Sequence, residues 1–232
     1  MFDIISFDAD DTLWHHNFIF VDTRQKFSRL LANHHDPKWI ENKLNDTEIR
    51  NLRRYGYGIK GFALSMIETA IELTQERITA PEIKEIIKLA WEMQATPISL
   101  LDGVKETIDL LSKSYKLIVI TKGDLFDQEA KMAQSGLGSY FTSIEVVSEK
   151  NRHTYESIIK KHELYPERFL MVGNSLKSDV LPVLEIGGKA VYIPYETTWA
   201  HEAVSASATS EREFFTIENI RLLPALLQQL VQ

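Results

Sequence analysis

The chain has 232 residues, of which 44% are hydrophobic and 25% are charged, and this is enough for one large domain or for a core with a smaller insertion. The formal net charge of −7 argues against a nucleic-acid-binding surface, and the absence of cysteine excludes disulfides, thiol catalysis and cysteine-based zinc sites. The sequence shows no targeting segment and no apolar run of the roughly 18 residues that a membrane helix needs. We therefore expect a soluble cytoplasmic protein without a nucleic-acid or membrane partner.

The first apolar run, residues 4–7, ends abruptly at three acidic residues, Asp8, Asp10 and Asp11. A short apolar run of this kind predicts a buried parallel strand. Carboxylates at the end of such a strand repel one another unless a cation lies among them. The pattern therefore predicts a strand that presents Asp8 and Asp10 to a divalent cation, for which Mg2+ is our expectation. The alternative is a solvated acidic turn after an edge strand.

About a hundred residues separate this strand from the next apolar run, many more than a crossover between parallel strands needs. Apolar residues repeat at helical spacing within residues 59–71 and 83–90. Together with residues 18–33 and 37–54, they predict an inserted four-helix bundle. Tyr57 and Lys60 lie in a glycine-containing break between two of these helices, where they could contact a substrate. The alternative is an ordinary helix break with solvated charges.

Strands and helices alternate in the rest of the chain, which is the pattern of parallel βαβ units with helices on both faces of the sheet. Polar residues close several of the strands, and ligands bind beyond the carboxyl ends of such strands. The segment at 205–210 is rich in small residues and predicts a loop. The expected strands are 117–120, 144–147, 169–172, 190–193 and 214–217, and the expected helices are 103–114, 125–135, 154–162, 179–186 and 220–230.

Four short motifs resemble, in order and spacing, the signature of the haloacid dehalogenase superfamily of hydrolases, most of whose members are phosphatases. The resemblance implies an α/β fold, in which a Rossmann-like, doubly wound parallel sheet forms the core at residues 1–14 and 98–232. It also implies an inserted α-helical cap domain of the C1 type at residues 15–97. The motifs are Asp8-x-Asp10-x-Thr12, Thr121-Lys122-Gly123-Asp124, Lys150 after Ser148-Glu149, and Gly173-Asn174 with Asp179.

The resemblance assigns the catalytic residues. Asp8 is the implied nucleophile, which forms an aspartyl-phosphate, and Asp10 is the implied general acid and base. Asp10 favours phosphoryl transfer over dehalogenation, because the dehalogenating members lack an Asp at this position. We expect the pKa of Asp10 to be raised by burial and by the neighbouring carboxylates. Thr121 is expected to bind a phosphate oxygen, and Lys150 to neutralise the phosphoryl group and keep Asp8 ionised.

The neighbours of these residues have more open interpretations. Backbone N–H groups around Gly123, where the next helix begins, suit a phosphate oxygen. Lys122 contacts the phosphate in one interpretation and is a surface charge in the other. Thr12 is expected to brace its turn by side-chain to backbone hydrogen bonds, and Asp11 is expected to have a structural role.

The same resemblance implies a Mg2+ site made of Asp8, the backbone carbonyl of Asp10, Asn174 and Asp179. The family usually has Asp where Asn174 stands, so this site carries one negative charge fewer, although an amide oxygen can still bind the metal. Asp179 could instead only cap the helix that follows it.

The predicted function is the Mg2+-dependent hydrolysis of a small phosphorylated metabolite, a phosphomonoester, through an aspartyl-phosphate. One alternative is a phosphomutase of the same fold, which passes the phosphoryl group to a sugar hydroxyl. Another is a non-catalytic protein that binds a phospho-ligand or a partner, an alternative that only Asn174 favours. The sequence indicates neither the substrate nor the oligomeric state.

Overall fold

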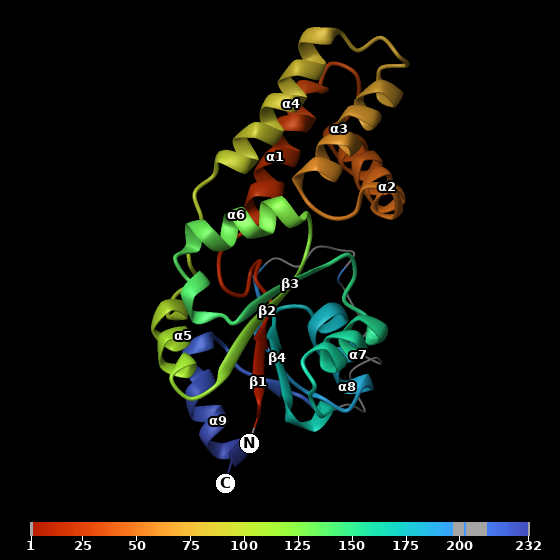
Figure 1. Cartoon of the computed structure of the whole chain (residues 1–232). Coiled ribbons are helices and arrows are strands. Elements are labelled where there is room, and N and C mark those ends of the chain that lie inside the picture. Colours follow the sequence, from red (N-terminus) through yellow and green to blue (C-terminus); the bar gives the residue numbers. More distant parts are fainter. Residues whose placement is uncertain (1, 197–201, 203–212, 232) are drawn as a thin grey trace. The chain divides into compact units, whose positions relative to one another are not determined.

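The computed structural model describes residues 2–196, 202 and 213–231, and it divides the chain into two compact units (Figure 1). The first unit comprises Met1–Asn17, Ile98–Lys122 and Gln128–Gln232, and the second comprises Phe18–Pro97 and Gly123–Asp127. Within the described ranges, no helix is both long enough and apolar enough to span a membrane. The loop predicted at 205–210 lies outside the described residues.

The first unit is built on a six-stranded sheet in the order β3-β2-β1-β4-β5-β6, with every neighbouring pair parallel. Strands β1 to β3 extend the sheet to one side, and strands β4 to β6 extend it to the other. The point between β1 and β4 is therefore a topological switch point, where a ligand crevice lies outside the carboxyl ends of the strands. The predicted α/β fold with a parallel sheet is confirmed. The strands are β1 Ile4–Phe7, β2 Lys116–Lys122, β3 Ser143–Val147, β4 Phe169–Gly173, β5 Lys189–Tyr192 and β6 Phe215–Thr216.

Helices cover both faces of this sheet (Figure 1). Alternate residues of a strand point to opposite faces, so Ile5 and Phe7 of β1 pack in the core with α5 and α9, whereas Ile4 packs with α7 and α8. The helices of this unit are α5 Val104–Ser112, α7 Arg152–Lys161, α8 Leu181–Glu185 and α9 Leu223–Val231, together with most of α6 Leu125–Ser135 and short 3-10 turns at Gly138–Tyr140, Pro166–Arg168 and Ile220–Leu222.

The helix predicted at 179–186 is divided in the structure into a π-helical turn, η3 Leu176–Val180, and the short helix α8. The side chain of Ser175 caps the turn by accepting a hydrogen bond from the backbone N–H of Ser178 (3.0 Å). The turn brings Asp179 against the end of β4. A Cβ atom at Gly173 would lie 2.2 Å from Asp179 Oδ2, so only glycine fits there.

The second unit contains four helices that share one hydrophobic core, to which they contribute Phe27, Leu44, Met66 and Ile86 respectively. The structure has a helix in each of the four segments for which the sequence predicted one. Two of its helices begin at conventional signals. Asp36 caps the helix that starts at Pro37, and Thr79 and Glu82 form a capping box in which they satisfy each other's backbone N–H groups. The four helices are α1 Asn17–Leu30, α2 Pro37–Tyr55, α3 Ile59–Leu73 and α4 Ala80–Ala95.

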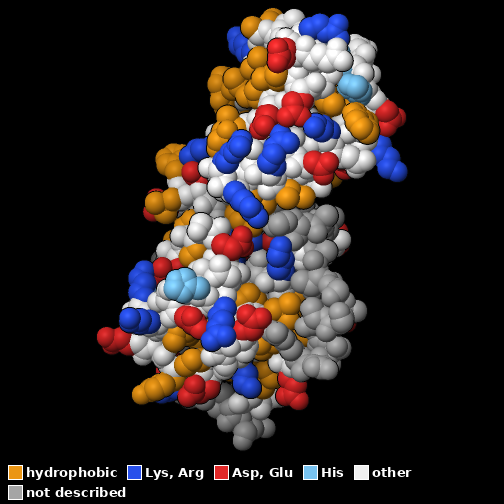
Figure 2. Space-filling model, turned by 90° about the vertical axis from the view of Figure 1, so that its right-hand side faces the viewer, with side chains coloured by type: hydrophobic (Ala, Val, Ile, Leu, Met, Phe, Trp, Pro, Cys, Tyr) orange, Lys and Arg blue, Asp and Glu red, His pale blue; other side chains and the backbone are white. Residues whose placement is uncertain are grey.

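Basic and acidic side chains alternate over the described part of the face in Figure 2. Exposed ion pairs among the described residues include Lys113 with Asp109 (2.7 Å) and Arg152 with Glu156 (2.8 Å). Pairs of this kind contribute little to stability, because solvent screens them. A group of buried charged side chains, Asp8, Lys150 and Asp179, lies at the carboxyl ends of the strands.

Candidate active site

The centre of the site is the ammonium group of Lys150, which lies between two carboxylates. Its Nζ atom donates hydrogen bonds to Asp8 Oδ1 (2.5 Å) and Asp179 Oδ1 (2.7 Å), and its side chain is only 1% exposed. Asp8 follows β1, Lys150 follows β3, and Asp179 lies in the turn after β4. The carboxyl ends of three parallel strands therefore bring together three residues that are far apart in the sequence.

Burial and charge act against each other in this cluster. Burial lowers the pKa of Lys150, but Asp179 and Asp8 outweigh it, so the pKa of Lys150 is raised and the side chain stays an ammonium. Burial raises the pKa of Asp179 to about 7, with a further contribution from the charge of Asp8, although Lys150 opposes the shift. One buried cation thus faces two buried carboxylates, and a further positive charge at this point would be stabilising.

The hydroxyl of Thr12 links the side chains of Asp8 and Asn174. The Thr12 hydroxyl is 3.0 Å from Asp8 Oδ2 and 3.2 Å from Asn174 Oδ1. A hydroxyl has a single hydrogen, so it can donate to only one of these two oxygens at a time. Thr12 therefore contacts side chains of the site, where we had expected it to bond to the backbone of its turn.

The donor set fits a hard cation such as Mg2+, which prefers oxygen ligands and usually keeps several of its waters. Both carboxylate oxygens of Asp179 are engaged, one by Lys150 and the other by the backbone N–H of Ser175 (2.9 Å). Asn174 Oδ1 and Asp8 Oδ2 share the Thr12 hydroxyl, so Asn174 offers an uncharged oxygen close to this group. In the described part of the chain, no three His, Cys, Asp or Glu side chains converge as a metal site, so neutral oxygens would have to complete the coordination.

The carboxylate of Asp10 accepts hydrogen bonds from three side chains. Lys131 Nζ lies 2.7 Å from both of its oxygens, Trp14 Nε1 donates to Oδ1 (2.7 Å) and Gln128 Nε2 donates to Oδ2 (3.0 Å). Burial raises the pKa of Asp10, but His16, Lys131 and these hydrogen bonds outweigh it and lower the pKa well below its usual value. The expectation that the pKa of Asp10 is raised is therefore wrong, because it did not include the cation supplied by α6.

His16 contributes little to this effect near neutral pH. Its Nε2 atom lies 3.5 Å from Asp10 Oδ2, but burial lowers the pKa of the imidazole to about 4. The ring is therefore neutral at pH 7, and Lys131 is the cation that holds Asp10 ionised.

Lys122 lies in a second buried cluster, next to the predicted phosphate-binding Thr121, which is only 2% exposed. Its Nζ atom donates to Glu202 Oε1 (2.6 Å) and to Ser178 Oγ (2.9 Å), and the hydroxyls of Ser175 (2.5 Å) and Ser178 (2.6 Å) donate to Glu202 Oε2. Burial raises the pKa of Glu202, but Lys122 and these hydrogen bonds lower it to about 2. The ammonium of Lys122 is therefore neither a solvated surface charge nor an unpaired phosphate ligand in this structure.

The other predicted substrate-binding residues, Tyr57, Lys60 and Gly123, belong to the second unit. Lys60 Nζ donates to Asp124 Oδ1 (2.7 Å) and lies 5.5 Å from the centre of the Phe126 ring. Gly123 has a φ of 137°, which favours glycine. A role for these residues in substrate binding stays a prediction.

Asp11 has the structural role that we predicted for it. Its φ of 61° lies in the left-handed region, and its carboxylate accepts hydrogen bonds from the backbone N–H groups of His16 (2.7 Å) and Asn17 (3.1 Å). These bonds satisfy donors at the start of α1, as an N-cap does. Asp11 therefore fixes the chain where it leaves the candidate site.

We expect Asp11→Ala to lower the free energy of unfolding by about 1 kcal/mol, since it removes the cap and keeps the left-handed Cβ that the wild type already carries. Asp11→Gly also removes the cap but relieves this backbone strain, so it should cost clearly less than Asp11→Ala. Urea unfolding of both variants at pH 7 measures the difference. Equal stability of the two variants would contradict this account of Asp11.

Sequence reasoning missed the three residues that bind the Asp10 carboxylate and the partner of Lys122. These are Trp14, Gln128, Lys131 and Glu202. A signal existed for Gln128, because it precedes the apolar Met132 by four residues on a predicted helix and so shares its buried face. Lys131 and Glu202 carried no such signal, since nothing in the sequence separates them from ordinary surface charges.

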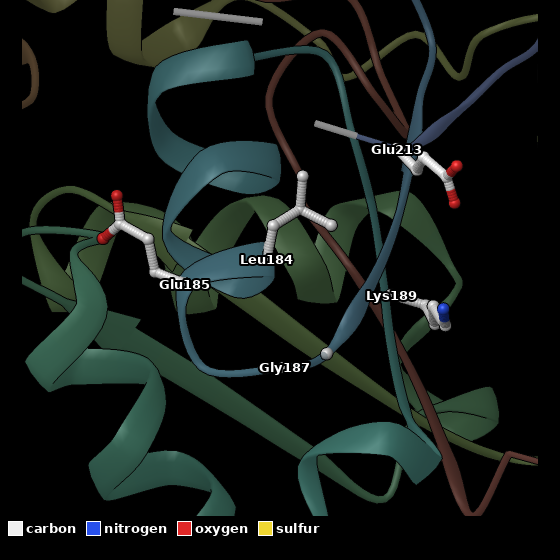
Figure 3. Close-up of a pocket in the computed structure, with 6 residues that line it drawn as sticks. Leu184, Glu185, Gly187, Lys189 and Glu213 are labelled. Atoms are coloured by element: carbon white, nitrogen blue, oxygen red, sulfur yellow. The ribbon is translucent and has the colours of Figure 1, made fainter. Parts of the chain in front are cut away.

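A surface pocket is shown in Figure 3. Lys189, which lines it, begins β5, whereas Asp8 and Lys150 follow the ends of strands parallel to β5. The pocket therefore lies at the amino ends of the strands, whereas the candidate site lies at their carboxyl ends. Its lining residues are Leu184, Glu185, Gly187, Gly188, Lys189 and Glu213.

Comparison with known proteins shows the family of the chain. The sequence matches the haloacid dehalogenase-like hydrolase family over residues 2–187. The chain belongs to this family. A solved structure of a haloacid dehalogenase-like family hydrolase from Xanthomonas campestris superposes with a TM-score of 0.88 at 39% identity, covering 99% of this chain and 91% of that one. The family is one of hydrolases, so the protein is identified as a hydrolase.

Two curated relatives are phosphatases. A glyceraldehyde 3-phosphate phosphatase of Methanothermobacter thermautotrophicus is 37% identical over 98 residues, which cover 40% of this chain and 43% of the relative. An N-acylneuraminate-9-phosphatase of Mus musculus is 26% identical over 170 residues, which cover 70% of this chain and 66% of the relative. The matched regions thus span less than two thirds of either relative.

Proposed function

We propose that this hydrolase is a Mg2+-dependent phosphatase, which hydrolyses a small phosphomonoester through an aspartyl-phosphate on Asp8. The observation that carries the proposal is the buried cluster in which Lys150 holds Asp8 and Asp179 (2.5 and 2.7 Å) at the carboxyl ends of the strands. The two phosphatase relatives support the same reaction class. We also propose that residues 15–97 act as a cap on a catalytic core at 1–14 and 98–232.

In the first step, a carboxylate oxygen of Asp8 attacks the phosphorus atom and the bond from phosphorus to the ester oxygen breaks. The leaving oxygen takes a proton from Asp10, so an alcohol departs and an acyl-phosphate remains on Asp8. Lys150 offsets the charge of the phosphoryl group as the two anions meet. Thr121 is the proposed hydroxyl ligand of a phosphate oxygen.

In the second step, a water molecule attacks the phosphorus atom and gives a proton to Asp10. The bond from phosphorus to Asp8 breaks, inorganic phosphate departs and the Asp8 carboxylate is restored. The lowered pKa of Asp10 suits this step, because the base has to be ionised when the water arrives. The first step needs the protonated acid, which the lowered pKa disfavours, so the negative charge of the bound phosphoryl group has to raise the pKa of Asp10 before the leaving oxygen can take its proton.

Asp8, the backbone carbonyl of Asp10 and Asn174 are the proposed ligands of Mg2+, with the charge of Asp179 nearby. When bound, the ion supplies positive charge that offsets the repulsion between Asp8 and the phosphate and stabilises the transition state. The oxygens of Asp8 and Asn174 around the Thr12 hydroxyl support this assignment.

A panel of small phosphomonoesters, assayed for phosphate release with Mg2+ and with EDTA, tests the proposed function. We expect hydrolysis of at least one ester in Mg2+, and a loss of about 100-fold or more in EDTA, because two anions then meet without the added charge. Phosphate release without an added sugar acceptor separates a phosphatase from a phosphomutase. Binding of the esters without any phosphate release would contradict the proposal.

A further inference from the structure

Helix α6 supplies two of the three side chains that hold the Asp10 carboxylate. Gln128 and Lys131 are three residues apart, so they share one face of the helix. Lys131 Nζ lies 2.7 Å from both oxygens of Asp10, and Gln128 Nε2 lies 3.0 Å from one of them. Neither residue belongs to the four motifs of the sequence analysis.

The orientation of the Gln128 amide follows from its partners. Its Nε2 atom donates to Asp10 Oδ2 and to the backbone carbonyl of Lys122 (2.9 Å), and both of these groups are acceptors. The NH2 end of the amide must therefore face them. The amide thus joins Asp10 to the end of β2, which carries the predicted phosphate-binding residue Thr121.

The carbonyl oxygen of the same amide has no hydrogen-bond partner among the described residues. Gln128 is only 4% exposed, and its Oε1 atom has no hydrogen-bond donor among the described residues. A buried acceptor without a donor is costly. An O–H group of a substrate or of a water molecule would satisfy Gln128 Oε1 by donating a hydrogen bond to it. Such an O–H group would lie next to Asp10, the residue with which it is to exchange a proton.

We infer that Gln128 and Lys131 are positioning residues for Asp10, which fix its carboxylate where it exchanges a proton with the leaving alcohol and with the attacking water. The inference rests on the proposed function, since it gives α6 a part in that reaction. The ion pair holds the carboxylate through two contacts, and the amide fixes it relative to β2. A misplacement of about 1 Å in a reacting group costs roughly 100-fold in rate.

The test compares two substrates, an aryl phosphate with a good leaving group and an alkyl phosphate with a poor one. Lys131→Met should lower kcat for the alkyl phosphate by about 100-fold and for the aryl phosphate much less, because only a poor leaving group depends on a placed acid. Lys131→Arg should recover most of the loss, since it keeps the charge and the donors. Gln128→Leu should show the same pattern with a smaller loss.

The decisive control is the Asp10→Ala background, in which Lys131→Met should have no further effect on kcat, because Lys131 acts only through Asp10. Lys113→Met, which removes an exposed ion-paired lysine of the same unit, and Gln134→Leu, at an exposed position of α6, should match the wild type. Equal losses for both substrates, or a full loss in the Asp10→Ala background, would overturn the inference. A wild type that hydrolyses no phosphomonoester would overturn the proposed function as well, whereas an active wild type with a fully active Lys131→Met overturns this inference alone.

Discussion

Asp8→Asn is expected to lower kcat for phosphomonoester hydrolysis by at least ~10⁴-fold, the scale on which removal of a catalytic nucleophile acts. An amide oxygen is a poor nucleophile and brings no negative charge to Lys150. The fold should survive, because Lys150 keeps its contact with Asp179 (2.7 Å). Steady-state kinetics and circular dichroism of the variant together separate lost chemistry from lost structure.

The matched control is Asp109→Asn, which removes an exposed carboxylate that pairs with Lys113 in the same unit. It should leave kcat within a factor of about two of the wild type, because exposed ion pairs contribute little. Activity of Asp8→Asn close to that of the wild type would remove Asp8 as the nucleophile, whatever its position in the cluster.

Lys150→Met is expected to have the largest effect on stability, a loss of about 3–5 kcal/mol in the free energy of unfolding. The physical reason is that two buried carboxylates, Asp8 and Asp179, are left without their cation. Phosphatase activity should disappear too, because the charge that offsets the meeting anions is gone. Urea unfolding of the variant, with Lys113→Met as the exposed control, measures the loss.

A second variant keeps this prediction testable if Lys150→Met fails to fold. The double variant Lys150→Met with Asp179→Asn removes one of the stranded carboxylates, so it should be more stable than Lys150→Met alone. Such non-additivity is expected of groups in direct contact. A double variant that is less stable than the single one would show that the charge of Asp179 does not depend on Lys150.

The sequence was sufficient for the architecture, because each step used a local signal. The apolar runs predicted the strands, and the polar residues that close them predicted which edge of the sheet carries the site. Asp8, Lys150 and Asp179 follow the strands β1, β3 and β4 of one parallel sheet, so topology brings them to the same ends of the strands. The resemblance to the haloacid dehalogenase superfamily then supplied the chemistry, and the family match agrees with it.

The environment of Asp10 could not be predicted in the same way. Its pKa depends on Lys131, which is 121 residues away in the sequence and looks like any surface lysine on a helix. The sequence suggested burial and neighbouring carboxylates, which raise the pKa of a carboxyl group, whereas this cation lowers the pKa of Asp10. The pairing of Lys122 with Glu202 was hidden for the same reason, since 80 residues separate the two.

The turn η3 is a second feature of the site that could not be predicted from the sequence. Helical periodicity predicted one helix over 179–186, but the structure divides the segment, and the π-helical turn before α8 aims Asp179 back at Lys150 and Gly173. Irregular turns of this kind are frequent at functional sites and follow no simple periodicity. The choice between Asn174 and Asp179 as a metal ligand depended on that turn, so the sequence left it open.

The central claim is that the phosphoryl group passes through Asp8, and acid-quenched mass spectrometry during turnover tests it most directly. The account predicts one phosphoryl group on the peptide that contains Asp8, which disappears as substrate is exhausted and is absent in Asp8→Asn. Turnover at an undiminished rate with the adduct on another residue, or with none at any quench time under single-turnover conditions, would contradict the account.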